Sequence, residues 1–224
     1  MNESNWLACS DPQLMLAFLK GKASERKLRL FALGYCRSIW HLLTDQRSRQ
    51  DVVTAERFAD RLATRSELEA AWAAVFDPDR SLPEWAVLHT TALIPLRSGT
   101  FSNSMDWGEA FSVVHVASRE GAELTVGRVG NRELSGLLRD IFGNPFRPIR
   151  FNPAWRTPTV TAVATAAYEE RSLPAGTLDA NRLAVLADAL EDAGCTNLDI
   201  LAHCRDGGPH VRGCWMIDLV LGKS

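Results

Sequence analysis

Helix start signals recur along this chain, and each is followed by apolar residues at helical spacing. After Ser24, large apolar side chains return every three or four residues, which predicts one buried stripe on an α-helix. Its members are Leu28, Phe31, Tyr35, Ile39 and Leu42. Thr64 and Glu67 form a capping box, in which the two side chains satisfy the free amides of a first helical turn. These local patterns are typical of a helical protein.

Applied to the whole chain, the patterns predict an all-α protein. A capping box at residues 10–13 opens a helix that ends at Gly21. Further helices are predicted over residues 25–43, 48–62, 65–76, 131–142, 158–170, 178–193, 197–205 and 209–221. The middle is less regular: residues 83–93 and 106–119 have helical character, although the second run could be a strand, and residues 123–129 could form one short extended piece. We therefore expect a multi-helix bundle or an irregular helical array.

A proline-rich segment interrupts the helices between residues 143 and 158. Its four prolines exclude a regular helix or a central strand, because proline lacks an amide hydrogen and restricts the backbone. The aromatic residues of the segment are too apolar to remain in water, so we expect an extended strap packed across the helices. Aromatic and arginine side chains are also enriched at protein interfaces. The alternative is therefore a partner-binding surface formed by Phe146, Arg147, Arg150 and Trp155.

Charge and composition disfavour several classes of function. The net charge of −2 predicts no strong affinity for nucleic acid or for an anionic membrane. No apolar run approaches the roughly 18–20 residues that span a bilayer. The first residues lack the basic start and apolar run of a signal peptide, so we expect a cytoplasmic location and reduced thiols rather than disulfides.

Cysteine and histidine are concentrated near the C-terminus. A set of three sulfurs and one nitrogen, of the kind that holds structural zinc, would consist of Cys195, Cys204, His210 and Cys214. His210 and Cys214 would face the same way if they lay on one helix. However, the spacing lacks the close cysteine pair of common zinc motifs. The favoured alternative is that these cysteines are small apolar residues in a helical core, without a bound cofactor.

Nucleophilic catalysis by a cysteine is a weaker alternative. His203 and Cys204 are adjacent, and neighbours on a helix point about 100° apart, which is poor geometry for an acid–base pair. Cys204 could instead meet His210 from the next helix. No glycine-rich element that could stabilise an oxyanion surrounds these residues.

Three stretches of the sequence resemble a known group of proteins. They are WLACSDPQLMLAFLKGKASERKLRLF with the following helix, LLRDIFGNPFRP, and LADALEDAGCTNLDILAHCR followed by HVRGCWMIDLVLGK. The chain resembles a family of paralogous helical proteins from planctomycete-type bacteria, and LADALEDAGC also resembles a short helical repeat-companion segment. The resemblance covers both ends and omits the middle, and it implies no activity, cofactor or catalytic residue.

Together, these observations predict the organisation and a class of function. Residues 1–77 are expected to form an N-terminal helical unit, residues 78–130 a variable middle segment, and residues 131–224 a C-terminal helical unit with the strap, all within one continuous domain. A capped helical scaffold without a catalytic set predicts a non-enzymatic interaction or adaptor module for an unknown protein partner. The alternative is a zinc-stabilised regulator or a metal-dependent enzyme that uses the C-terminal cysteines and histidines.

Overall fold

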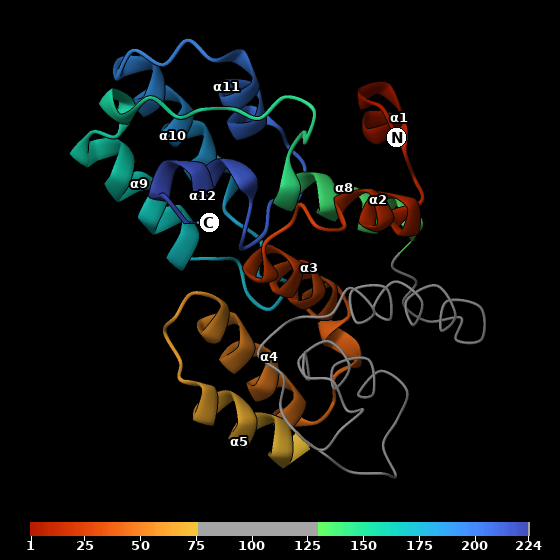
Figure 1. The fold of residues 1–224 in the computed structure, drawn as a ribbon. Helices are drawn as coiled ribbons and strands as arrows, with labels where there is room; N and C mark the ends of the chain where they lie inside the picture. The colour runs from red at the N-terminus through yellow and green to blue at the C-terminus, as the bar shows by residue number, and fades with distance from the viewer. Residues whose placement is uncertain (76–129, 224) are drawn as a thin grey trace. The chain divides into compact units, whose positions relative to one another are not determined.

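The computed structural model describes residues 1–75 and 130–223, and there the chain is helical (Figure 1). Its regular elements are α-helices and short 3-10 helices. Within the described residues, β pairing is confined to isolated bridges of Thr177 with Ser172 and Val211. The predicted all-α fold class is therefore confirmed. The elements predicted at residues 83–93, 106–119 and 123–129 lie outside the described residues.

The chain forms two compact units that interleave in sequence. Unit 1 comprises Met1 and Ala8–Leu138, and unit 2 comprises Asn2–Leu7 and Arg139–Ser224. The boundary falls within helix α8 (Asn131–Phe142), which begins in unit 1 and ends in unit 2. Unit 2 therefore combines a short piece from the beginning of the chain with the C-terminal third.

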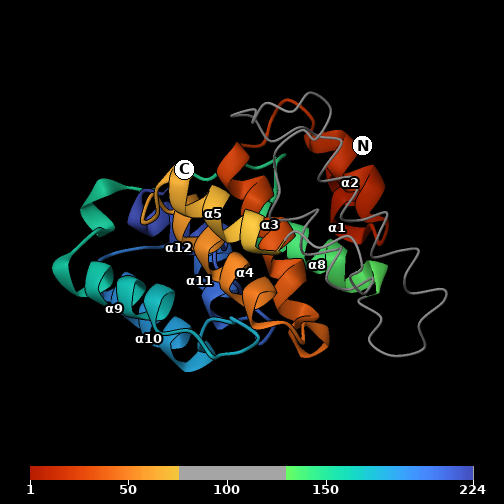
Figure 2. The same cartoon turned by 90° about the horizontal axis from the view of Figure 1, so that it is seen from below.

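Unit 1 is a set of packed helices. They are α2 (Pro12–Leu19), α3 (Glu25–Ser38), the 3-10 helix η1 (Trp40–Leu42), α4 (Gln46–Ala59), α5 (Arg65–Val75) and the start of α8. Helix α4 packs against α3 and α5, and α4 and α5 lie side by side in both views (Figures 1 and 2). The stripe predicted on α3 is buried at Leu28, Phe31, Tyr35 and Ile39. Gly34 lets α8 approach α3, because a Cβ there would lie 3.0 Å from Cδ1 of Leu137.

Side-chain caps explain where the helices of unit 1 begin. Ser24 accepts a hydrogen bond from the amide of Lys27, as its position predicted. Thr64 and Glu67 cap one another, with the Glu67 amide 3.2 Å from Thr64 Oγ1 and the Thr64 amide 2.7 Å from Glu67 Oε2. The prediction for the first helix was wrong by one residue, because Asp11 rather than Ser10 is its cap. Asp45 starts α4 two residues earlier than predicted.

Two other expectations for the N-terminal half were also wrong. The helix predicted over residues 25–43 ends at Ser38, where the Ser38 hydroxyl donates to the Tyr35 carbonyl at 2.6 Å and competes with the Ile39 amide for it. A short helix, α1 (Glu3–Ala8), was not predicted. It buries only Trp6, so its sequence has no periodic apolar stripe.

Unit 2 places four helices around one apolar core. They are α9 (Pro158–Glu169), α10 (Ala180–Asp192), α11 (Leu198–Arg205) and α12 (Trp215–Leu221). Helix α10 packs against α9 and α11, and α12 packs against α9 (Figure 1). Thr157, Asp179 and Asn197 cap α9, α10 and α11 with their side chains. The starts predicted for these three helices are right to within two residues.

The helix predicted over residues 209–221 was wrong in its first half. Only residues 215–221 are helical, and Cys214 is the N-cap of α12. The preceding backbone is held in a different way, because the Leu178 amide donates to the His210 carbonyl at 2.8 Å and Val211 pairs with Thr177. Gly213 has a φ of +91°, which interrupts any helix at that point. His210 and Cys214 therefore do not share a helix face.

Candidate metal centre

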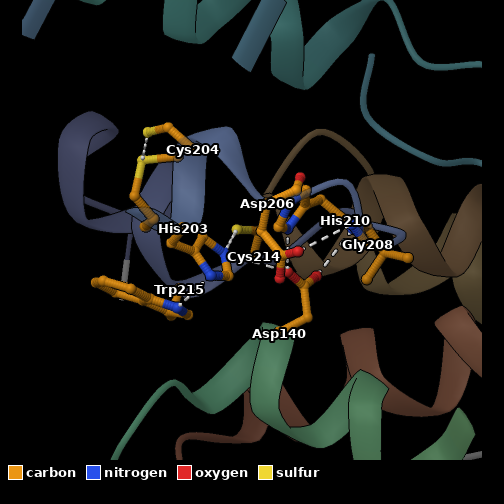
Figure 3. Close-up of polar contacts among 10 residues, drawn as sticks. Asp140, His203, Cys204, Asp206, Gly208, His210, Cys214 and Trp215 are labelled. Atoms are coloured by element: carbon orange, nitrogen blue, oxygen red, sulfur yellow. Dashed lines mark hydrogen bonds and ion pairs between the residues drawn. The ribbon is translucent and has the colours of Figure 1, made fainter. Parts of the chain in front are cut away.

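Four side chains of unit 2 converge on a common point. Asp140, His203, His210 and Cys214 each offer one ligand atom, and these atoms all lie within 4.8 Å of one another (Figure 3). Asp140 comes from the last turn of α8 and His203 from α11. His210 lies in the segment before α12, and Cys214 is the N-cap of that helix. We call these four residues the ligand cluster.

The separations within the ligand cluster bracket those of tetrahedral coordination. Sγ of Cys214 is 3.1 Å from Nε2 of His203, which is in turn 3.4 Å from Oδ1 of Asp140. Nδ1 of His210 is 2.7 Å from the same Asp140 oxygen. A tetrahedral ion with bonds of about 2.0–2.3 Å has ligands roughly 3.3–3.7 Å apart. To seat such an ion, the Asp140–His210 pair must separate by about 0.6–1 Å, and the widest separation, up to 4.8 Å, must close by about 1 Å.

Neighbouring groups contact Asp140, His210 and His203 from outside the ligand cluster. The second oxygen of Asp140 accepts a hydrogen bond from the Val211 amide at 2.9 Å. The Nε2 atom of His210 lies 3.2 Å from the Asp206 carbonyl, so its proton on that side leaves Nδ1 to face the ligand cluster. The indole of Trp215 donates to Nδ1 of His203 at 3.3 Å (Figure 3). The contacts of Asp140 and His210 are of the kind that orients metal ligands. The His203 contact is not, because an indole only donates, so a neutral His203 carries its proton on Nε2, and zinc binding at Nε2 would require that proton to leave.

Burial and charge couple Asp140 to the histidines. Burial by itself would raise the pKa of the Asp140 carboxyl, but hydrogen bonds and charge from His203 and His210 hold that pKa below its ordinary value. Burial opposes the charged form of His210 as well, yet its bond to Asp140 raises the pKa of the imidazole above the ordinary value. The two directions agree, because each partner favours the charged form of the other.

This pair predicts how stability depends on pH when a chelator withholds zinc. His210, whose folded pKa lies above 6.5, stabilises the fold fully below that pH and loses its contribution as pH rises through the raised value. Asp140, whose folded pKa lies below 3.8, contributes above that pH and loses its contribution as pH falls through the lowered value. We expect the stabilisation from the pair to be greatest between these limits, with each pKa unit worth about 1.4 kcal/mol. Urea unfolding across this range measures it, and His210→Gln should remove the decline at high pH.

The structure brings together two of the four metal ligands that the sequence suggested. His210 and Cys214 belong to the ligand cluster, whereas Cys195 and Cys204 lie in the apolar core of unit 2. Sγ of Cys204 is 3.5 Å from Sδ of Met216. Burial raises the pKa of the Cys204 thiol to about 12, with a smaller contribution from Cys195. Cys204 therefore stays protonated at neutral pH, which is unsuitable for a nucleophile.

His203 and Asp140 were missed as ligands. His203 was judged as a partner for its neighbour Cys204, yet on α11 it faces the ligand cluster while Cys204 faces the core (Figure 3). Its spacing to His210 and Cys214 was the available signal. Asp140 was not among the suggested ligands, and it bonds His210, 70 residues later. A contact so distant in sequence leaves no local pattern.

The proline-rich segment lies across unit 2 as an extended strap with one 3-10 turn, η2 (Pro153–Trp155). Trp155 is half-buried against the core and makes an edge-to-face contact with Phe151, with ring centroids 5.6 Å apart. Arg156 donates to the carbonyls of Val220 and Leu219, which ties the strap to the last turn of α12.

The four residues proposed as a partner-binding surface differ in exposure. Phe146 and Trp155 are half-buried, whereas Arg147 and Arg150 are exposed. Nε of Arg147 lies 2.6 Å from a carboxylate oxygen of Glu3. Only the arginines of the set therefore present most of their surface to solvent.

Among the described residues, every helix is too short or too polar to cross a bilayer. The resemblance to a planctomycete-type family remains a prediction. No protein-family model, curated protein or solved structure matches this chain.

Proposed function

We propose that unit 2 is a zinc-stabilised, non-enzymatic helical module whose metal ligands are Asp140, His203, His210 and Cys214. The observation that carries this proposal is the convergence of four ligand atoms within 4.8 Å, supplied by α8, α11 and the segment that leads into α12. A metal at this point would join the ends of α8 and α11 to the start of α12. It would therefore tie together segments that are distant in sequence.

The donor set favours zinc over other common metals. One carboxylate, two imidazoles and one thiolate match the oxygen, nitrogen and sulfur ligands that Zn²⁺ accepts in a tetrahedral site. Magnesium and calcium require sites rich in oxygen ligands, and iron–sulfur clusters are held mainly by thiolates. The mixed cluster contains too few oxygens for the first class and too few sulfurs for the second.

Burial supports a structural rather than a catalytic metal. The side chains of Asp140, His203 and His210 are 6%, 16% and 4% exposed, and Cys214 is fully buried. Structural zinc sites use four protein ligands, whereas catalytic sites keep one position open to water or substrate. A role in holding a protein partner, as the sequence suggested, fits a module that is stabilised in this way.

The test is the metal content of the full-length protein purified under reducing conditions. We expect about one equivalent of zinc per chain, and removal by a chelator should lower the thermal midpoint reversibly. Hydrogen exchange should show lost protection in residues 139–223 and little change in residues 24–75, because the ligand cluster lies wholly in unit 2. Less than about a tenth of an equivalent, with no stabilisation by added zinc, would refute the proposal.

A further inference from the structure

The N-terminal helix α1 is joined to the ligand cluster through a chain of partly buried contacts. Trp6 is fully buried, and its indole nitrogen donates to the Gly143 carbonyl at 3.0 Å. In return, Arg139 donates to the Trp6 carbonyl at 3.3 Å. Arg139 and Gly143 lie on either side of Asp140 at the end of α8. Helix α1 therefore forms hydrogen bonds on both sides of the turn that carries this ligand.

A second route runs from the same turn to His203. Gly143 has a φ of +65°, and a Cβ there would lie 3.0 Å from Cγ of Trp215, so the turn packs directly on the indole. The Trp215 ring in turn packs on His203, with ring centroids 4.9 Å apart. Movement of the Gly143 turn would therefore disturb a second ligand as well as Asp140.

Polar contacts outside the buried core hold α1 in register with this turn. A carboxylate oxygen of Glu3 accepts from the Asn144 side chain at 2.8 Å and pairs with Arg147 at 2.6 Å. The compact units reflect the same association, since residues 2–7 group with residues 139–224 rather than with residue 8 onward. Helix α1 therefore belongs almost entirely to unit 2, although it lies far from the rest of that unit in sequence.

We propose that α1 is an intramolecular clamp that holds the metal ligands in place, with Trp6 as the positioning residue, so that loss of the clamp releases the metal. This inference rests on the proposed zinc site. Trp6 acts through Arg139 and Gly143 on Asp140, and through Gly143 and Trp215 on His203. Partners that orient metal ligands typically contribute 10–100-fold to metal affinity.

The test compares zinc release from the full-length protein and its variants to a chromophoric chelator. Trp6→Ala should release zinc roughly tenfold faster than the wild type or more, and Trp6→Phe, which keeps a ring but loses the donor, should lie between them. Glu3→Gln provides a mild variant on the surface of the clamp in case Trp6→Ala does not fold. Cobalt-substituted protein adds a spectroscopic signature, because distorted coordination changes the visible bands of the ion.

Leu183→Ala is the matched control, since Leu183 is fully buried in the apolar core of unit 2 and belongs to neither α1 nor the ligand cluster. It should lower the thermal midpoint without a comparable change in release rate or in the cobalt spectrum. Release from the Trp6 and Glu3 variants at the wild-type rate, or at the rate of Leu183→Ala, would overturn the clamp and leave the zinc site standing. A wild type that binds no zinc would overturn both.

Discussion

Replacing Cys214 with alanine is expected to abolish stoichiometric zinc binding, whereas replacing Cys204 with alanine is expected to leave one equivalent in place. Cys214 supplies the thiolate of the ligand cluster, while Cys204 lies against Met216 in the apolar core. Loss of a ligand should reduce zinc affinity by more than the 10–100-fold typical of an orienting partner. Metal analysis after extensive dialysis measures the difference.

The two substitutions should also differ clearly in their effect on the free energy of unfolding. When free zinc exceeds its dissociation constant about 1,000-fold, binding stabilises the fold by about 4 kcal/mol, and Cys214→Ala should lose most of this. Cys204→Ala removes one sulfur from a packed site and should cost less, in a manner independent of zinc. Zinc loss from the Cys195→Ala and Cys204→Ala variants, with retention by Asp140→Asn, would instead support the ligand set that the sequence suggested.

Replacing Glu56 with glutamine is expected to destabilise unit 1 by about 3–5 kcal/mol. Glu56 forms a two-point ion pair with Arg37, with oxygen–nitrogen distances of 2.9 and 2.7 Å. Both side chains are buried, at 3% and 5% exposure. Glutamine is close to glutamate in shape but removes the buried negative charge that faces Arg37. Urea unfolding measures the loss.

The control is Glu69→Gln in the same unit. Glu69 pairs with Arg65 one turn earlier on α5, at 2.7 Å, but both side chains are partly exposed to solvent. Pairs of this kind contribute about 0.3–0.5 kcal/mol. Equal effects of the two substitutions would show that burial does not strengthen the Arg37–Glu56 interaction.

The sequence revealed the helices better than the site. Caps such as Ser24, Thr64 and Thr157 act within one turn, so residues three positions apart were enough to locate the start of a helix. The segment before α12 was mistaken for helix because its conformation depends on pairing with Thr177 and Leu178, which local spacing does not report.

The ligand cluster was only half visible for the same reason. The concentration of cysteine and histidine near the C-terminus correctly suggested His210 and Cys214 as ligands. It also suggested Cys195 and Cys204, whose sulfurs instead pack in the apolar core. Asp140 looked like one of many acidic residues on a helix. Only folding brings it 2.7 Å from His210.

Unit 2 is formed by two segments that are far apart in sequence, and this has a consequence for protein synthesis. Trp6 is synthesised before its bonding partner Gly143, which is 137 residues further along the chain. At roughly 5–20 residues per second, the indole waits on the order of ten seconds before that partner is even translated, and longer for the residues that complete the unit. Throughout that interval a large apolar side chain is available to chaperones, so the nascent protein should depend on them more than a unit built from one continuous stretch.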